Sequence, residues 1–307
     1  MDTLVRAQTF VAVSEVWVPK GERLVHGGGD YGALEGFEAA SRRESFGLGE
    51  GLPGKAWAER RPVVLKSFDG SYFKRTEAAR DAGLTAAVAI PVFAGEALRA
   101  VLVVLCAGDD DHIGAIEVWA DDDGTLSLED GYYGAAGHFE WVSRRTSFPR
   151  GQGLPGAVLA SGAPILMRDL GSGYRFVRAE AAGKAGLTTG LGIPVLAPGG
   201  PARVVTLLSA RGTPIARRFE IWRVRGDGAE LTDGICEIEG PLWPQENPDP
   251  APRRARAHAG PVGRALGTGM PVAQGGAAGL PGGYARAVAL PIHSGDGAPS
   301  HVVAWHL

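Results

Sequence analysis

The sequence predicts an α+β protein made of three tandem antiparallel sheets, each with short helices on one face, packed with approximate three-fold pseudo-symmetry. Three observations support this prediction: short motifs recur at a nearly constant spacing, apolar runs have the length of strands, and turn-forming residues are abundant. The chain has 307 residues, and its 47 glycines and 21 prolines require many turns and disfavour long helices. A chain of this length also predicts two or three domains.

Internal repeats define the domain organisation. The motifs Glu-x-Trp, Gly-Leu-Pro-Gly, Ala-Gly-Leu-Thr and Ile-Pro-Val occur twice or more in the same order, and the last third of the chain keeps only variants of some of them. Glu-x-Trp occurs at 15–17, 117–119 and 220–222 (Glu-Ile-Trp in the third), and Gly-Leu-Pro-Gly at 51–54, 153–156 and 260–263 (Gly-Pro-Val-Gly in the third). Ala-Gly-Leu-Thr occurs at 82–85 and 185–188, and Ile-Pro-Val at 90–92, 193–195 and 290–292 (Leu-Pro-Ile in the third). The repeats predict three copies of one unit, at residues 1–109, 110–212 and 213–307, of which the third is eroded and shorter.

The same elements are expected in each copy, in one order. A strand with Glu-x-Trp is followed by a turn, a second strand and a polar, partly alternating stretch. Gly-Leu-Pro-Gly opens a short helix, and a second helix rich in alanine ends at a glycine. Two near-continuous apolar strands close the unit, as expected for central strands covered on both faces. These helices and closing strands are predicted at 55–60, 76–82, 86–93 and 98–106, and again at 157–161, 179–185, 189–196 and 202–209.

The motifs of the first copy, in order and spacing, resemble those of a GAF domain, in particular the GAF modules of bacterial sensor kinases. The resemblance rests on the run from Phe46 to Trp57, then Arg61-Pro62-Val63, Phe73-x-Arg75, Ala82-Gly83-Leu84 and Ile90-Pro91-Val92. The second copy is similar over residues 148–208, and the third is similar through its Glu-Ile-Trp strand and closing hairpin. The resemblance implies a sheet of five or six strands with a small-molecule pocket beneath the short helices. It also implies either binding of a cyclic nucleotide, bilin, haem or small metabolite, or a dimerising module that binds nothing.

The segments between the copies are short. GAF domains in sensors are usually bracketed by helices that cover the second sheet face, but residues 106–113 and 209–217 leave no room for a two-turn helix. The closing strand at 301–307 has nothing after it, so we expect neither a transducing helix nor an output domain. Because an apolar sheet face must be buried, we expect the copies to cover one another. Pairing with a second chain is the alternative, and the oligomeric state stays open.

Aromatic residues, aspartates and arginines before the second helix are the candidate ligand site. In an open pocket the rings would form the walls and a guanidinium would bind an anionic group. In the alternative that we favour, Arg75 and Arg178 pair with Asp69 and Asp169 and the rings fill the core. The Glu-x-Trp pairs are expected to be packing residues. The candidate residues are Trp57, Phe68, Asp69, Tyr72, Phe73, Arg75 and Thr85 in the first copy and Asp169, Tyr174, Phe176, Arg178 and Thr188 in the second.

Composition argues against several functions. The net charge of −3 gives no reason to expect nucleic acid or a membrane as a partner, and no apolar run reaches the roughly 18 residues of a membrane helix. The two cysteines, Cys106 and Cys236, are expected to be structural, and the seven histidines lack metal-ligand spacing. We therefore expect a cytoplasmic protein with no cofactor and no metal.

The function that this sequence favours is sensing. The preferred hypothesis is a stand-alone protein that binds a small metabolite in the first or second copy and acts through a protein partner, without being an enzyme. The alternative is an interaction scaffold or accessory subunit with filled pockets. A redox enzyme that uses Cys106 is the third and least favoured hypothesis.

Overall fold

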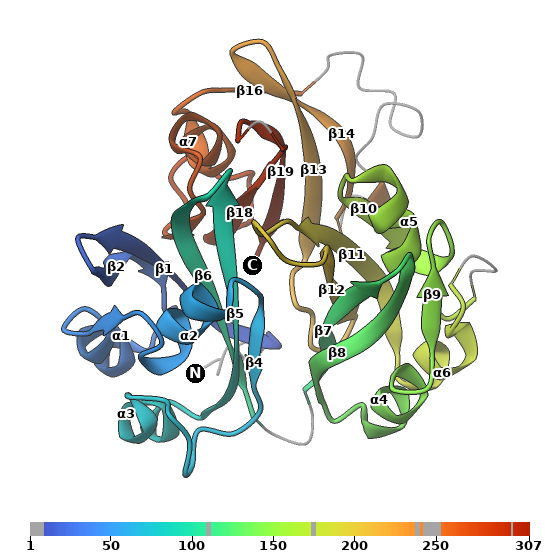
Figure 1. The fold of residues 1–307 in the computed structure, drawn as a ribbon, viewed down its shortest axis with the longest axis horizontal. Coiled ribbons are helices and arrows are strands. Elements are labelled where there is room, and N and C mark those ends of the chain that lie inside the picture. Colours follow the sequence, from blue (N-terminus) through green and yellow to red (C-terminus); the bar gives the residue numbers. More distant parts are fainter. Residues whose placement is uncertain (1–8, 109–111, 173–175, 237–239, 242–252, 296) are drawn as a thin grey trace, which may run out of the picture.

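The fold is described from a computed structural model, which places residues 9–108, 112–172, 176–236, 240–241, 253–295 and 297–307. Figure 1 shows three sheets arranged around a common centre, with the chain running from the blue unit through the green one to the orange and red one. Strand pairs within every sheet are antiparallel, and the three sheets share one strand order. The predicted α+β class and three-sheet architecture are therefore confirmed.

The first sheet has the order β3-β2-β1-β6-β5-β4. Its strands are β1 (Val11–Lys20), β2 (Arg23–Asp30), β3 (Ser45–Gly47), β4 (Val63–Leu65), β5 (Leu84–Ala94) and β6 (Ala97–Ala107). Three short helices accompany it: α1 (Glu35–Ser41), α2 (Gly51–Glu59) and α3 (Thr76–Asp81).

The second sheet repeats this arrangement as β10-β11-β12-β7-β8-β9. Its strands are β7 (Ile113–Asp122), β8 (Thr125–Gly134), β9 (Ser147–Pro149), β10 (Ile165–Arg168), β11 (Leu187–Val195) and β12 (Arg203–Ala210). Its helices are α4 (Gly137–Ser143), α5 (Gly153–Ser161) and α6 (Ala179–Lys184).

The third sheet keeps the order but has fewer helices in its described part. Its strands are β13 (Arg218–Arg225), β14 (Gly228–Cys236), β15 (Gly240–Pro241), β16 (Arg254–Arg256), β17 (Val272–Gly275), β18 (Arg286–His293) and β19 (Pro299–His306), and β16 pairs with β14. The helix α7 (Gly260–Thr268) corresponds to α2 and α5. Residues 276–285, which follow β17, form no helix, so the alanine-rich second helix of the other copies has no counterpart there.

The Gly-Leu-Pro-Gly motif lies inside its helix. Helix α2 begins at Gly51, four residues earlier than predicted, and Gly51 has φ +59°. A Cβ at Gly54 would lie 2.1 Å from the carbonyl oxygen of Gly47, and the Gly49 amide donates to the Gly54 carbonyl at 2.8 Å. The last glycine is therefore required because β3 passes against the first turn of the helix.

The three sheets share one core. A single cluster of buried apolar side chains contains Ile90 and Leu102 from the first copy, Leu207 from the second, and Phe219 and Trp305 from the third. Each copy also has its own cluster on the side of its helices. The expectation that the copies cover one another's open sheet faces is confirmed.

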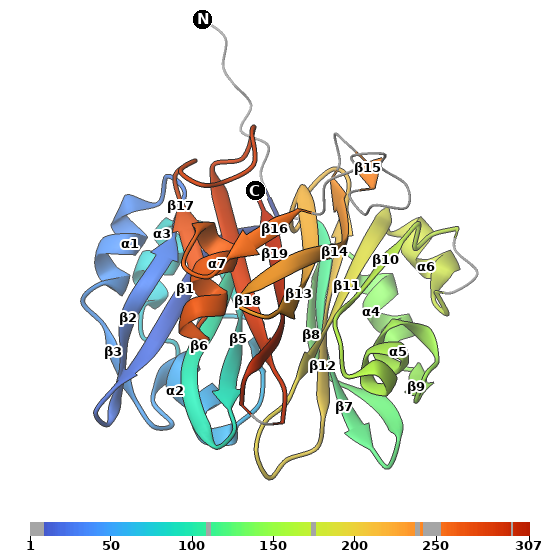
Figure 2. The same cartoon turned by 90° about the horizontal axis from the view of Figure 1, so that it is seen from above.

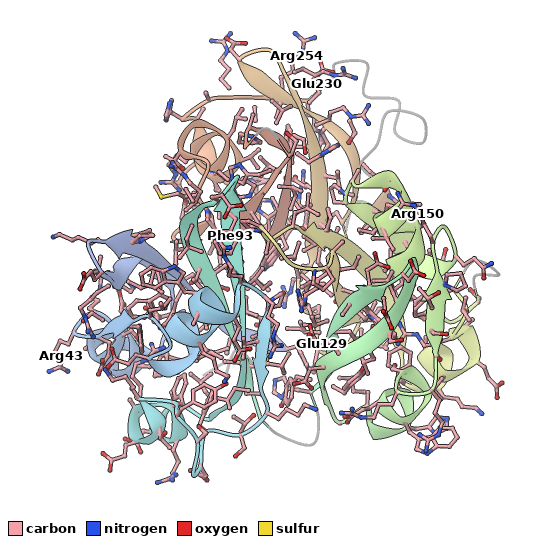
Figure 3. The ribbon with its side chains drawn as sticks, in the orientation of Figure 1. Arg43, Phe93, Glu129, Arg150, Glu230 and Arg254 are labelled. Atoms are coloured by element: carbon pink, nitrogen blue, oxygen red, sulfur yellow. The ribbon has the colours of Figure 1, made fainter. Side chains whose placement is uncertain are left out.

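The outer and inner parts of the molecule differ in chemistry. Figure 2 shows α1 to α3 on one flank and α4 to α6 on the other, with the long strands between them. In Figure 3, Phe93 lies near the middle, whereas Arg43 and Arg254 lie at the periphery.

Where the chain passes from β6 to β7 and from β12 to β13, its described residues form no helix. Within the described parts of the chain, no helix has the length and apolar character needed to cross a bilayer.

The shared core makes a testable prediction about cooperativity. Leu102 is fully buried on β6, so we expect Leu102→Ala to lower the free energy of unfolding by about 2–5 kcal/mol. Leu48→Ala, at a side chain that is 64% exposed, should change it by no more than about 0.5 kcal/mol. Urea unfolding followed by tryptophan fluorescence and circular dichroism should show one transition in both variants. Separate transitions for separate copies would contradict a shared core.

Candidate functional site

A buried carboxylate lies at the centre of the first copy, beneath its helices. Glu15 on β1 is fully buried and accepts hydrogen bonds from Trp17 Nε1 at 3.0 Å and Tyr31 Oη at 3.1 Å. Arg75, the residue before α3, donates to both carboxylate oxygens, with Nη2 at 3.0 Å from Oε2. Residues two apart on a strand point to the same face, which is why Glu15 and Trp17 both face the helices.

The guanidinium of Arg75 fills the space where the family resemblance places a ligand. Aromatic rings surround it, with centroids 4.8 Å (Phe37) to 5.9 Å (Phe46) from its central carbon, and Trp17 and Phe73 lie between these limits. Its Nη atoms donate to Glu15 and to Ser41, and the residue is 5% exposed. The Nη donors of Arg75 therefore bind groups of the protein itself.

The second copy repeats the arrangement. Glu117 on β7 accepts from Trp119 Nε1 at 3.0 Å, Tyr133 Oη at 3.1 Å and Thr206 Oγ1 at 2.8 Å. Arg178 donates to both of its oxygens, with Nη2 at 2.9 Å from Oε2. Its surrounding rings are those of Trp119, Phe139, Phe148 and Phe176.

The predicted partners of these two arginines were wrong. Asp69 forms an exposed ion pair with Arg80 at 2.6 Å, and Asp169 is exposed at the edge of a cleft described below. The arginines instead lie over the first strand, which carries the Glu-x-Trp motif. These glutamates are charge partners as well as neighbours of a packed tryptophan, a role that the packing interpretation of the motif missed. One feature of the sequence could have indicated this pairing: both intact copies contain Glu-x-Trp together with the arginine before the second helix.

The third copy keeps the buried carboxylate with other partners. Glu220 on β13 accepts from Arg218 Nε at 2.6 Å and Trp222 Nε1 at 2.9 Å, and His306 Nε2 lies 3.2 Å from it. Burial alone would raise the pKa of Glu220, but hydrogen bonding by His306 and the charges of His306 and Arg218 outweigh it and lower the pKa to about 2. Burial likewise opposes ionisation of Glu15 and Glu117, and their arginines lower the pKa of each carboxyl below its ordinary value.

The remaining candidate residues are spread over core and surface. Phe68 and Phe73 stack on each other with centroids 4.0 Å apart, and Phe176 is buried in the core of the second copy. Trp57 is half-buried, Tyr72 is 41% exposed, and Thr85 is exposed with its Oγ1 3.3 Å from Tyr132 Oη. Tyr174 lies outside the described residues.

Both cysteines are buried thiols. Cys106 is fully buried, and burial raises the pKa of its thiol, which argues against redox chemistry at this residue. The Sγ atom of Cys236 lies 2.9 Å from Tyr284 Oη. Across the described residues, no group of three His, Cys, Asp or Glu side chains is placed to hold a metal ion.

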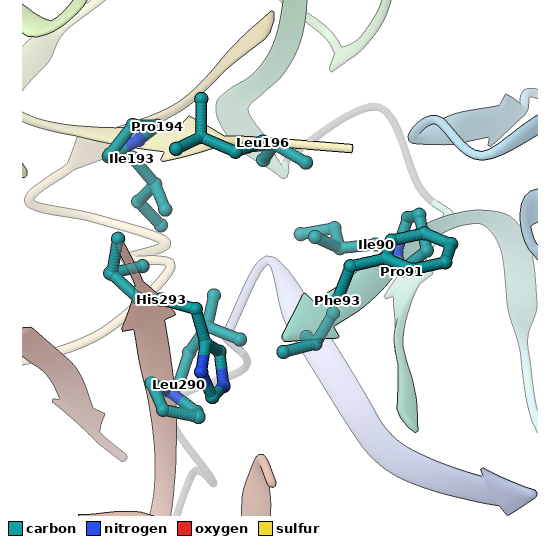
Figure 4. A pocket seen from close by; sticks show the side chains of 12 residues that line it. Ile90, Pro91, Phe93, Ile193, Pro194, Leu196, Leu290 and His293 are labelled. Atoms are coloured by element: carbon teal, nitrogen blue, oxygen red, sulfur yellow. The ribbon is translucent and has the colours of Figure 1, made fainter. Parts of the chain in front are cut away.

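The recurring Ile-Pro-Val motif lies at the common axis. Figure 4 shows Ile90, Pro194, Leu290 and their neighbours from all three copies around a small central hollow. Its volume of about 30 Å³ matches about one water molecule, so this motif serves packing. His293 ties the third copy's contribution in place, with ring nitrogens 3.0 Å from the carbonyl oxygens of Gly269 and Gly297.

A larger cleft, of about 460 Å³, lies where the second copy meets the third, and we name it the junction cleft. From the second copy it is lined by Asp169, Thr188, Thr189, Ser209 and Arg211. From the third copy it is lined by Ala216, Arg217, Phe219, Ile235 and Cys236. Two predicted site residues, Asp169 and Thr188, thus lie together here.

At the corresponding junction between the first and second copies, aromatic rings narrow the space, and a hollow of about 190 Å³ remains beside Thr85 and Gly108. Asp30, Tyr132 and Ile235 hold the same position in their copies, each 15 residues after the glutamate of Glu-x-Trp. Tyr132 packs against Phe10 with ring centroids 5.5 Å apart and reaches Thr85. The smaller Ile235 leaves the corresponding space open between the second and third copies.

The junction between the third and first copies is filled by an ion pair. Arg286 Nε donates to Asp30 Oδ2 at 2.6 Å. Arg286 on β18 is equivalent to Thr189 on β11, because each pairs with the last residue of the neighbouring edge strand, β17 or β10. The junction cleft therefore has Thr189 and Ile235 where this junction has a long cation and a carboxylate.

The buried pair predicts a large difference between two acidic residues. Glu15→Gln should lower the free energy of unfolding by about 3–5 kcal/mol, because it leaves Arg75 as a buried charge without a carboxylate. Asp69→Asn should cost less than about 1 kcal/mol, because its side chain is 71% exposed. Urea unfolding at neutral pH measures both. An equal or larger loss in Asp69→Asn would overturn the assigned pairing.

The depressed pKa values predict acid sensitivity. A carboxyl with a lowered folded-state pKa stabilises the fold above its unfolded value, and this contribution is lost as pH falls toward the folded value. For Glu220 that window runs from about 4.5 down to about 2. We expect the free energy of unfolding to fall between pH 5 and pH 3, as measured by urea titrations, and the fall should be smaller in Glu220→Gln. The exposed Glu22→Gln is the control and should keep the wild-type pH dependence.

Comparisons with known proteins found a family model and solved structures that match part of the chain. The family model described as GAF domain matches residues 1–120, and the curated proteins gave no match. Among solved structures, the A. aeolicus nlh2 GAF domain in an inactive state is 20% identical, over 32% of this chain and 59% of that chain, with a TM-score of 0.27. The GAF-B domain of DevS from Mycobacterium smegmatis is 24% identical, over 32% and 61%, with a TM-score of 0.24. The free methionine-R-sulfoxide reductase from Neisseria meningitidis, in complex with its substrate, is 16% identical, over 31% and 51%, with a TM-score of 0.24.

The present chain thus spans between 51% and 61% of the length of these three structures. Strands β1 to β6 all lie within the residues that the family model matches, and the second and third sheets repeat their order. The first 120 residues thus match the model described as GAF domain, and the three sheets, which share one strand order, fit tandem GAF-like domains.

Proposed function

We propose that this protein is a small-molecule sensor whose ligand binds in the junction cleft between the second and third copies. GAF domains are sensory and ligand-binding modules, and the first copy belongs to this family. The proposed protein carries no catalytic activity and passes its signal to a protein partner. The observation that carries the proposal is that this cleft of about 460 Å³ has walls from two copies, whereas the counterpart residues Asp69, Thr85 and Gly108 line a smaller hollow of about 190 Å³ within the first copy.

The helix-side interiors are poor ligand sites by comparison. Arg75 and Arg178 occupy them, and each is paired with a buried glutamate and surrounded by rings. A ligand there would have to displace a buried charge pair, which leaves an unpaired charge behind. The junction cleft requires no such displacement, and a volume of about 460 Å³ is within the usual range for small-molecule sites.

The cleft is also placed where a ligand could change the protein. Its walls belong to two copies, so a ligand that contacts both favours the arrangement in which they are close. In the described part of this junction, a side-chain tie between β10 and β14 is Arg168, which donates to Asp233 Oδ1 and to the Gly234 carbonyl. A bound ligand would add a second tie, and the partner would read the change in the third copy.

A second candidate function, an interaction scaffold that binds no ligand, is favoured by one observation. The interiors that resemble GAF pockets are filled in both intact copies. Under this alternative the junction cleft is solvent-filled space, and no small molecule stabilises the protein.

Filling the cleft tests the proposal. Ile235→Tyr places at the second junction the residue that lies at the first one, and Ile235→Val is the matched control that keeps the cleft open. In a thermal-shift screen of small metabolites on the full chain, we expect a ligand that raises Tm in the wild type and in Ile235→Val but not in Ile235→Tyr. A ligand that acts equally on Ile235→Tyr binds elsewhere, and a screen in which no compound raises Tm supports the scaffold.

A further inference from the structure

Building on the proposed function, we infer that the junction cleft binds a small organic anion, whose carboxylate or phosphate group is held by Arg211 and Arg217. Arg211 directly follows β12, and Arg217 directly precedes β13, so the loop that joins the second copy to the third supplies both. A guanidinium matches an oxyanion in shape and charge and can donate two parallel hydrogen bonds to it.

Both arginines have unused donors. In the described part of the chain, neither side chain forms an ion pair or a hydrogen bond. The arginines on nearby strands are used: Arg168 pairs with Asp233, and Arg218 pairs with Glu220. Two unpaired guanidinium groups that line one cleft leave positive charge there, because Asp169 is the one acidic residue among the described lining residues.

Hydroxyl groups complete a polar lining. Ser209 Oγ accepts a hydrogen bond from the Ile215 amide at 3.0 Å, which leaves its proton free to be donated. Among the described residues, the Thr189 hydroxyl makes no hydrogen bond. These groups and the Asp169 carboxylate suit an anion that also carries hydroxyl or amino groups.

The loop that carries the arginines is fixed at several points. Thr213 Oγ1 accepts from the Ile113 amide at 2.7 Å and donates to the Ile113 carbonyl at 3.0 Å. The Ile215 amide is held by Ser209, as noted above, and the Arg217 amide donates to the His306 carbonyl at 2.9 Å. A loop held in this way presents its side chains without a large ordering cost on binding.

Comparison within the chain shows that the positive charge occurs at the larger of two spaces, about 460 Å³ at the junction cleft against about 190 Å³ beside Gly108. Gly108 holds the position of Arg211 in the first copy, since each directly follows the last strand of its copy. Gly114 holds the position of Arg217 in the second copy, since each lies three residues before the glutamate of Glu-x-Trp. The junction with the aromatic rings therefore has two glycines where the junction cleft has two arginines.

The third junction shows that this place accommodates a carboxylate. Asp30 holds the position of Ile235, and its carboxylate is bound there by Arg286. Burial raises the pKa of Asp30, and the Arg286 charge opposes that rise. At the junction cleft the protein supplies the guanidinium groups but an isoleucine in place of the carboxylate, so a ligand can supply the anion.

Titration with defined anions tests the inference. Citrate and inorganic phosphate are the probes, titrated into the full chain by calorimetry at constant ionic strength, with glycerol as the neutral comparison. We expect citrate, phosphate or both to bind, and Arg211→Gln and Arg217→Gln each to weaken binding by at least about tenfold. Arg225→Gln, an exposed arginine at the far end of β13, is the control and should bind as the wild type does. Ile235→Tyr should abolish binding.

The outcomes separate the inference from the proposed function. Binding of citrate alone assigns the site to carboxylates, and binding of phosphate alone assigns it to phosphates; both support the inference. If anion binding is unchanged in both Arg211→Gln and Arg217→Gln, the anion is an adventitious ion only, and the inference is overturned. A neutral metabolite whose binding is lost in Ile235→Tyr but kept in Arg211→Gln would overturn the inference and leave the proposed function standing. If neither these anions nor any screened metabolite binds, both are wrong.

Discussion

Each of the three sheets has two apolar faces, and its own helices can cover only one of them. On β6, Val101 and Val103 belong to the core beneath the helices, whereas Leu102 and Val104 belong to the core shared by all three copies. Burial of the second set depends on the presence of the other two sheets. Because each buried aliphatic side chain contributes on the order of 1.5–3 kcal/mol, this shared core ties the stability of each copy to that of its neighbours.

Three sheets around one axis create three junctions, and their outer ends must each be filled or solvated. The chain places aromatic rings at the first and an ion pair at the third. At the third junction, β17 and β2 carry glycines, Gly275 and Gly28, where the other two junctions have an ion pair. These ion pairs are Lys66 with Asp130 and Arg168 with Asp233. The second junction is different, because small side chains there border arginines that have no ion-pair partner among the residues that the structure describes. The difference between a structural junction and a binding cleft is thus a matter of a few side chains at equivalent positions.

The buried glutamates form the other constraint. Each sits on the first strand of its copy, next to the tryptophan that donates to it, and each is paired with an arginine. In the first two copies this cation precedes the alanine-rich helix, so the pair holds that helix to the sheet. The third copy has no such helix among its described residues and uses Arg218 and His306 of its own sheet instead. Loss of the helix and exchange of the charge partner therefore go together.

The sequence by itself determined the repeat, the succession of strands and helices along each unit and the mutual covering of the sheets, because these depend on local turns, apolar runs and linker length. It also identified Arg75 and Arg178 as important but assigned them the nearby aspartates, since spacing along the chain carries no information about contacts between residues 60 positions apart. Only the tertiary structure decided that Arg75 and Arg178 are paired inside their copies and that the junction cleft lies between copies. A cleft at a junction depends on how side chains from two sheets meet, as with Ile235 against Tyr132, and no single copy of the motif contains that information.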